Sequence, residues 1–313
     1  MLSRPDEIAV ALQLALLLEA SAYPKPGNVH RTWDFEHTRF EHFLASAAAL
    51  GPHFRLAALR GRRVRDGSPH GLEPAIGEHM MRAVETCSMW QHGGNTSLGT
   101  ILLLTPMAYA AGMVARRSAL KAEEIRRNLR EVVKRTTSAD AVNTYRAISF
   151  ASPGGIGRVR ELDVNDEKSI MEIRKRDISL FQIFRISSAY DAVSREWVTG
   201  FHVTFDIGLP SLSKEIRATG DINAAIVDTY LEILSRIPDT LVARKQGMNT
   251  AKEISHKAKR VLEAGAMKTA RGRRAVKQMD KALQRPGHLL NPGTTADLTA
   301  SALSVLLLEG YRP

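Results

Sequence analysis

Apolar residues recur at intervals of three and four along most of the chain, which is the spacing of amphipathic α-helices. A first helix is predicted over residues 4–21, because Ser3 and Asp6 form a capping-box pattern around Pro5 in the first turn. Further helices are predicted over 40–50, 72–90, 122–134, 140–150, 221–236, 250–264 and 273–283, with one or two more within 167–198. In the helix over 221–236, Ile222, Ile226 and Ile233 lie on one apolar stripe, and Asp228 and Glu232 fall outside it.

Two further segments, 98–114 and 294–309, are apolar on nearly every side, which is typical of a helix buried within a protein. The first is barely long enough to cross a bilayer and contains Pro106, so a core helix is favoured over a membrane span. Segment 200–212 fits either a short strand or a broken helix. No alternation of strands and helices is visible, so the sequence predicts one multi-helical all-α domain over 1–313, with buried central helices and a basic helical segment, 245–285, on its rim.

Composition narrows the class of protein only a little. The contents of 44% hydrophobic and 25% charged residues are typical of a soluble globular chain. A single cysteine, Cys87, excludes a disulfide framework and favours a reducing compartment. Asp6 and Glu7 stand where a signal peptide would be basic, so a cytoplasmic protein is expected. The net charge of +11 suits an anionic partner: nucleic acid, a membrane surface or a polyphosphate.

Glu19 lies at the end of the first helix, on the same stripe as Ile8, Leu12, Ala15 and Leu16. A carboxylate among apolar residues is costly unless it is paired, hydrogen-bonded or bound to a metal. Glu19 is therefore a candidate functional residue, although a glutamate in a last turn can also reach water.

The last apolar helix begins with Thr294, Thr295 and Asp297, which again fit a capping box. That pattern would give Asp297 a purely structural role. A buried helix N-terminus also attracts anions through its free N–H groups, so a phosphate beside the threonines and a metal beside Asp297 are equally consistent with the pattern.

Residues 92–104 repeat this arrangement, since two glycines precede Asn95 and Thr96 and an apolar helix follows. The glycine-rich stretch 152–162 lacks the flanking strand and spacing of a dinucleotide fingerprint, and a flexible loop is favoured there. The basic stretches 55–67 and 257–285 lack interleaved aromatics, which argues against RNA binding but leaves polyphosphate binding open. No zinc-binding motif or nucleophile-elbow motif is present.

Three motifs, EASAYPKPGNVHR, GGNTSLG and NPGTTADLTASAL, together resemble the triphosphoribosyl-dephospho-CoA synthase family over residues 12–310. The resemblance implies an all-α transferase. It would move the 5-triphosphoribosyl group of ATP to the ribose 2′-hydroxyl of 3′-dephospho-CoA, release adenine and make a prosthetic-group precursor. Where classical members carry Asp and His-Lys, this chain has His30 and Ser97-Leu98, so the resemblance also admits a divergent branch with another acceptor.

The resemblance also implies a set of site residues. The carboxylates of Glu19, Asp34 and Asp297 would stabilise an oxocarbenium-like state and accept a proton, with Asp34 and Asp297 holding Mg²⁺. The expected substrate-binding residues are Lys25, Gly27, Asn28, His30, Asn95, Thr96, Gly293, Thr294 and Thr295.

The expected partners are small molecules, ATP and dephospho-CoA or a related acceptor, with a homodimer as a candidate assembly and neither nucleic acid nor a membrane. Three alternatives stay open: a sister-branch ribosyl or phosphoribosyl transferase, an N-glycoside hydrolase, and a basic helical RNA-binding protein.

Overall fold

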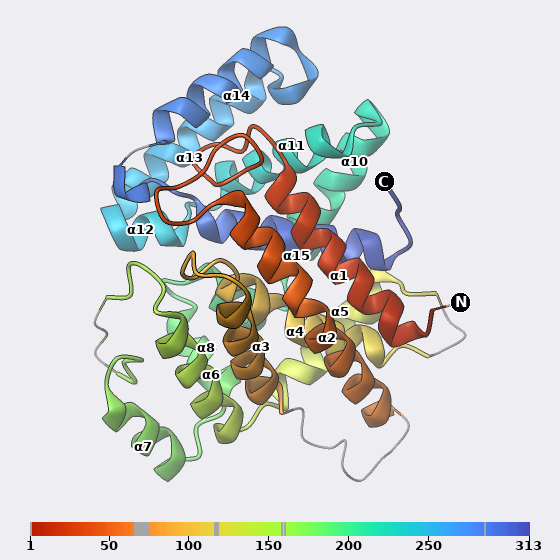
Figure 1. The fold of residues 1–313 in the computed structure, drawn as a ribbon, viewed down its shortest axis with the longest axis vertical. Helices are drawn as coiled ribbons and strands as arrows, with labels where there is room; N and C mark the ends of the chain where they lie inside the picture. The colour runs from red at the N-terminus through yellow and green to blue at the C-terminus, as the bar shows by residue number, and fades with distance from the viewer. Residues whose placement is uncertain (1, 66–74, 116–118, 158, 160, 285) are drawn as a thin grey trace.

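The computed structural model describes residues 2–65, 75–115, 119–157, 159, 161–284 and 286–313 (Figure 1). The described residues form helices and loops without a β-strand, which confirms the all-α prediction. The first half of the chain contains α1 (Arg4–Ser21), α2 (Phe40–Arg65), α3 (Ile76–Trp90), α4 (Leu98–Gly112), α5 (Ala122–Lys134), α6 (Ser138–Ala151) and α7 (Glu167–Lys175). The second half contains α8 (Leu180–Ser187), α9 (Ala192–Thr199), α10 (Leu209–Thr219), α11 (Ile222–Arg236), α12 (Thr240–Gln246), α13 (Met248–Glu263), α14 (Ala270–Leu283) and α15 (Gly293–Leu308).

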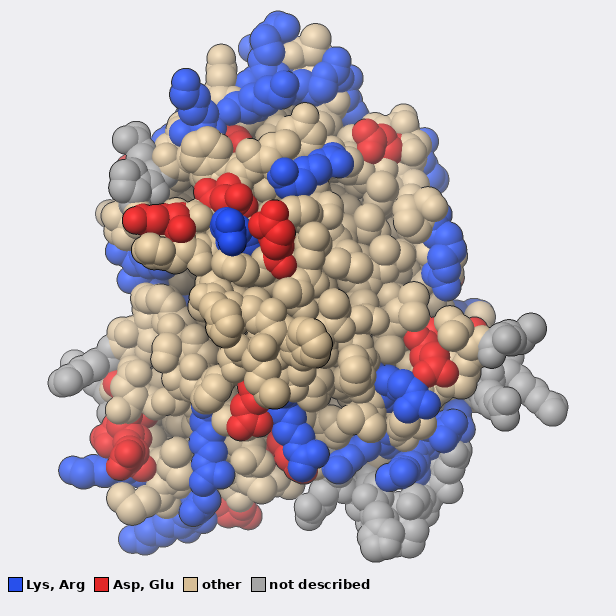
Figure 2. Space-filling view, in the orientation of Figure 1, with Lys and Arg blue, Asp and Glu red and all other residues tan. Residues whose placement is uncertain are grey.

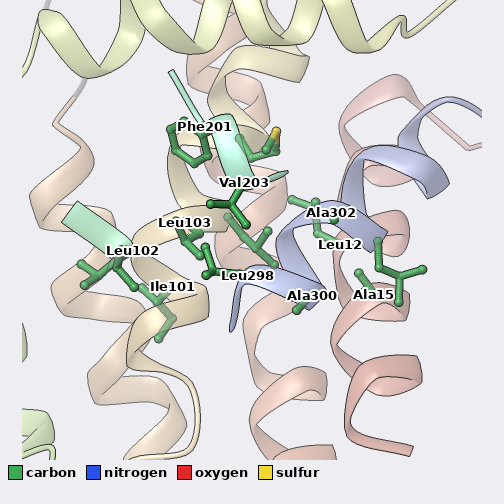
Figure 3. Packing of buried hydrophobic residues seen from close by; sticks show 14 of the residues in the cluster. Leu12, Ala15, Ile101, Leu102, Leu103, Phe201, Val203, Leu298, Ala300 and Ala302 are labelled. Atoms are coloured by element: carbon green, nitrogen blue, oxygen red, sulfur yellow. The ribbon is translucent and has the colours of Figure 1, made fainter. Parts of the chain in front are cut away.

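Helices α4 and α15 occupy the centre of the molecule, as their uniformly apolar sequences predict (Figure 1). They pack against each other and against α1, while α2 covers α1 and α4. Figure 3 shows Leu12 of α1, Leu103 of α4 and Leu298 of α15 within one packed cluster. Each fully buried leucine of this kind contributes about 1.5–3 kcal/mol to folding. The core therefore fixes the N-terminal ends of α4 and α15 relative to the last turn of α1.

Helix α2 continues well past residue 50, the end that the sequence predicts, and contains Pro52. Phe54, Ala57 and Ala58 extend its buried face against the core. Packing of this apolar face outweighs the local preference of proline to end a helix.

The stretch over 167–198 forms three short helices rather than one or two, and each begins with a side-chain cap. The caps are Asp166 before α7, Ser179 before α8 and Asp191 before α9. The ambiguous segment near 200–212 is a π-helical turn, Val203–Gly208, that leads into α10. The buried carboxylate of Glu196 accepts hydrogen bonds from the backbone N–H groups of Val203 and Thr204, which explains the irregular turn.

Asp228 of α11 is buried, with 2% of its surface exposed, although it lies outside the apolar stripe of this helix. The helix is covered on that side by η3 (Ala266–Lys268), whose Met267 N–H donates to Asp228 Oδ1 at 2.9 Å. Burial raises the pKa of this carboxyl to about 6.

Helices α13 and α14 form one end of the molecule, and Lys and Arg side chains gather there in Figure 2. No helix in the described part of the chain combines the length and apolar character that crossing a membrane requires.

Candidate active site

A cavity of about 600 Å³ lies where the last turn of α1 meets the N-terminal ends of α4 and α15. Its remaining walls come from the loop after α6, from α8 and α9, and from α12. The cavity brings together residues that the sequence places almost three hundred positions apart. The predicted site residues on its wall are Glu19, Asn28, Asn95, Thr96, Gly293, Thr294 and Asp297.

Asp297 lies against the N-terminus of α4, and the backbone N–H of Thr100 donates a hydrogen bond to its carboxyl. The approach is close because Gly99 has no side chain: a Cβ at this position would collide with Asp297 Oδ2. Burial raises the pKa of Asp297 well above its usual range, and the negative charge of Glu19 adds to the shift. The capping-box interpretation of Asp297 is wrong, because α15 begins at Gly293 without a side-chain cap.

Glu19 is paired with Lys25, whose Nζ lies 2.5 Å from Glu19 Oε1 and also donates to the Glu19 carbonyl oxygen at 2.9 Å. The lysine is 1% exposed and lies outside the cavity wall, whereas Glu19 is on that wall. Lys25 therefore offsets the charge of Glu19 and fixes its side chain, which is a different contact from the phosphate binding that the sequence predicts.

Gly27 and His30 face α14 and not the cavity. The Gly27 N–H donates to Asp280 Oδ1 at 3.1 Å, and His30 Nε2 lies 3.2 Å from Asp280 Oδ2. Tyr230 donates to the Pro26 carbonyl oxygen at 2.9 Å from the other side. These contacts anchor the loop and place Asn28, between Gly27 and His30, on the cavity wall.

Asp34 lies apart from the other predicted carboxylates, and its side chain is exposed. Asp34 Oδ1 accepts a hydrogen bond from the Phe40 N–H at 2.7 Å, at the start of α2. This contact is of the kind that caps a helix N-terminus. The structure does not bring Asp34 to the cavity, and its assignment as a catalytic residue and Mg²⁺ ligand finds no support in the geometry.

The N-terminus of α15 already has a carboxylate partner. Asp239, the N-cap of α12, accepts hydrogen bonds from the Thr295 N–H at 2.7 Å and from Thr295 Oγ1 at 2.8 Å. Thr240 Oγ1 donates to Thr294 Oγ1 at 3.3 Å. Thr295 itself lies outside the cavity wall, so its predicted contact with a phosphate is taken by Asp239.

The start of α4 is likewise occupied by protein groups. Asn95 Oδ1 accepts a hydrogen bond from the Leu98 N–H at 3.0 Å, although the N-cap of α4 is Ser97. Thr96 Oγ1 lies 2.7 Å from Ser46 Oγ. The Thr100 N–H is also bonded, to the Asp297 carboxyl. Fewer N–H groups at this helix end therefore remain to bind a phosphate than the sequence suggests.

Several cavity residues are absent from the sequence-based set: Arg244, Lys245, His288, Asn291 and the glycine-rich loop after α6. Arg244 and Lys245 lie at the edge of a basic segment that the sequence predicts to be a solvated rim, so nothing in the sequence marks them as cavity residues. Asn291 opens the NPGTTAD motif and could have been found there. Its Oδ1 is buried and has no hydrogen-bond partner among the residues that the structure describes.

Residues 5–313 match the family model described as ATP:dephospho-CoA triphosphoribosyl transferase. A probable 2-(5″-triphosphoribosyl)-3′-dephosphocoenzyme-A synthase of Pseudomonas savastanoi pv. phaseolicola is 27% identical over 302 residues, covering 96% of this chain and 89% of the relative. A Klebsiella pneumoniae 2-(5″-triphosphoribosyl)-3′-dephosphocoenzyme-A synthase is 26% identical, with 94% and 88% covered. A crystal structure from Archaeoglobus fulgidus, described as a candidate triphosphoribosyl-dephospho-CoA synthase, matches 88% of this chain and all of its own, with a TM-score of 0.66 and 29% identity.

Proposed function

We propose, from the premise that this chain belongs to the ATP:dephospho-CoA triphosphoribosyl transferase family, that it transfers the 5-triphosphoribosyl group of ATP to the ribose 2′-hydroxyl of 3′-dephospho-CoA and releases adenine. The observation that carries this proposal is the family match over residues 5–313. The cavity supports it, because Glu19 and Asp297 both face the space where the reacting sugar would lie. The basic RNA-binding alternative is not favoured by the family to which the chain belongs.

The proposed reaction breaks the bond between adenine and the anomeric carbon and joins that carbon to the acceptor oxygen. Positive charge develops on the sugar as the adenine leaves, as in glycoside hydrolysis, and a nearby carboxylate stabilises that charge. A base must also take the proton of the attacking hydroxyl. The described cavity wall carries the carboxyl groups of Glu19, Glu161, Asp163, Asp191 and Asp297. Of these, Glu19 lies close enough to Asp297 for its charge to raise the Asp297 pKa, and we propose this pair for the two tasks.

The two carboxyl groups differ in their surroundings. Glu19 is held by the Lys25 ammonium, which fixes its position on the wall. Asp297 has no such cation among its described contacts, and burial raises its pKa. We assign charge stabilisation and proton transfer to this pair of carboxyl groups.

The cavity also fits Mg²⁺ bound together with the phosphates of a nucleotide. The described residues contain no group of three or more His, Cys, Asp or Glu side chains that could hold a metal ion by themselves. Mg²⁺ at nucleotide sites needs only one or two protein carboxylates, with phosphate oxygens and waters as its other ligands. Of the two Mg²⁺ ligands expected from the sequence, Asp297 faces the cavity. The negative charge of the neighbouring Glu19 raises the pKa of Asp297. When bound there, Mg²⁺ would neutralise phosphate charge.

The small-molecule substrates are the partners that this proposal requires. A cytoplasmic location accords with the biosynthetic role of the family, and the homodimer stays a prediction.

Product analysis tests the proposal and separates the alternatives. We expect the purified protein, given ATP, Mg²⁺ and dephospho-CoA, to release one adenine for each dephospho-CoA that gains a triphosphoribosyl group, as measured by liquid chromatography and mass spectrometry. Free ribose triphosphate without an acceptor adduct would instead indicate an N-glycoside hydrolase. No adenine release with any acceptor would contradict the proposal.

A further inference from the structure

The cavity wall includes a second polar region, at α12 and beneath the glycine-rich loop that follows α6. Gly154, Ile156 and Gly157 of the loop line the cavity, as do Arg244 and Lys245 of α12. The loop packs directly on α12: a Cβ at Gly154 would lie 3.4 Å from Lys245 Cε, and a Cβ at Gly155 would lie 3.1 Å from Lys245 Cγ. Gly155 also has a φ of +78°, which side-chain-bearing residues rarely adopt. Glycine at these positions lets the backbone reach the lysine.

The loop carries backbone hydrogen-bond donors that have no acceptor within the described part of the chain. Among the residues that the structure describes, no acceptor bonds the backbone N–H groups of Gly154, Ile156 and Gly157. Consecutive free N–H groups in a turn, next to a cationic side chain, form an anion-binding concavity. The sequence of the loop alone does not indicate an anion site, because Lys245 lies about ninety positions further along the chain.

Among the described residues, Lys245 is a cavity-lining cation that forms no ion pair with a carboxylate. Lys25 is neutralised by Glu19, and Arg244 Nη1 lies 2.8 Å from Asp191 Oδ1. Lys245 Nζ instead donates a hydrogen bond to the His288 carbonyl oxygen at 3.2 Å. Burial lowers the pKa of Lys245, and the negative charge of Asp239 offsets part of this shift. A bound anion would form the direct ion pair that Lys245 lacks among the described residues.

We propose that Lys245, with Arg244 and the backbone of residues 154–157, forms the subsite that binds the phosphate chain of a substrate nucleotide. This inference rests on the proposed function. Both helix N-termini that the sequence favours for phosphate carry protein carboxylates, Asp239 on α15 and Asp297 on α4. The phosphate chain therefore lies at α12, and the wall formed by 287–297 leads from Lys245 towards Asp297.

Direct binding measurements test the subsite without requiring turnover. We would titrate wild type and Lys245→Met with ATP, adenosine, dephospho-CoA and inorganic tripolyphosphate by isothermal calorimetry in the absence of Mg²⁺. Removing a charge-assisted contact should weaken binding of the phosphate-bearing ligand about 10- to 100-fold. Adenosine binding should stay unchanged. Lys252→Met is the matched control, because Lys252 is an exposed lysine of α13 away from the cavity and should change nothing.

The ligand whose binding Lys245→Met weakens shows which substrate places its phosphate chain at this subsite. Weaker ATP and tripolyphosphate binding assigns the subsite to the donor triphosphate, and weaker dephospho-CoA binding assigns it to the acceptor diphosphate. Unchanged affinity for all phosphate-bearing ligands in a folded Lys245→Met protein would overturn the proposal, as would an equal loss in Lys252→Met. Gly155→Ala is a second variant that should weaken the same ligand if Lys245→Met does not fold.

The two proposals fail separately. If Lys245→Met releases adenine and binds every ligand with unchanged affinity, the subsite proposal is wrong and the proposed function stands. If ligand binding depends on Lys245 but the protein releases no adenine, the proposed function is wrong and the anion site stands.

Discussion

The buried ion pair between Glu19 and Lys25 makes a quantitative prediction about stability. Replacing Glu19 with Gln leaves an ammonium that is 1% exposed without its counter-charge. Breaking a buried ion pair by removing one partner costs about 3–5 kcal/mol, because the remaining charge stays desolvated. The entropy of unfolding is about 2.1 cal/mol/K per residue, or about 0.7 kcal/mol/K for 313 residues. Glu19→Gln should therefore lower the Tm by about 5–8 °C.

Thermal unfolding followed by circular dichroism at neutral pH measures this effect. The double variant Glu19→Gln/Lys25→Met removes both charges and should recover most of the lost stability, as replacing a whole buried pair often does. Glu78→Gln is the control, because it breaks an exposed pair with Arg82 on α3 and should cost less than about 1 kcal/mol. The reasoning is refuted if Glu19→Gln unfolds within 1 °C of wild type (a threshold of about the error of such a scan), or if the double variant is less stable than the single. Activity of Glu19→Gln is interpretable only beside these data.

Two further predictions concern buried carboxyl groups. Because burial raises the folded-state pKa of Asp228 from 3.8 to about 6, this residue makes wild type lose stability as the pH rises from about 4 to 6. Asp228→Asn should therefore be more stable than wild type by up to about 3 kcal/mol at pH 7 and equal to it near pH 4, and a pH-independent difference in urea unfolding would contradict this. Gly99→Ala places a methyl group against the Asp297 carboxylate and should lower kcat by about 10-fold or more. Unchanged kcat in that variant would show that the position of Asp297 does not matter.

Local patterns were sufficient to predict most helices. The capping box at Ser3 and Asp6 does begin α1, and Asp221 caps α11. Such signals depend on residues three or four positions apart, which a sequence displays directly. The end of α2 depends on contacts with α1 and α4, so its sequence alone places the end too early.

The site shows the same division between local and distant contacts. Glu19 and Asp297 could be singled out because a carboxyl group on an apolar helix is conspicuous. Their partners could not, since Lys25 turns back from a proline-rich loop to reach Glu19, and the Thr100 N–H that bonds Asp297 belongs to another helix. Lys245 was indistinguishable from other basic residues of its segment, because net charge does not indicate which side chain faces a cavity.

The rate of adenine release in Asp297→Asn is the most direct measurement of the central claim, that this cavity carries out the transfer. Asp228→Asn is the matched control, because Asp228 is also a buried carboxyl group with a raised pKa and lies outside the cavity wall. With ATP, Mg²⁺ and dephospho-CoA, wild type and Asp228→Asn should release adenine at similar rates, and Asp297→Asn should be slower by about 100-fold or more. Adenine release by Asp297→Asn at the wild-type rate, or an equal loss in Asp228→Asn, would contradict the account.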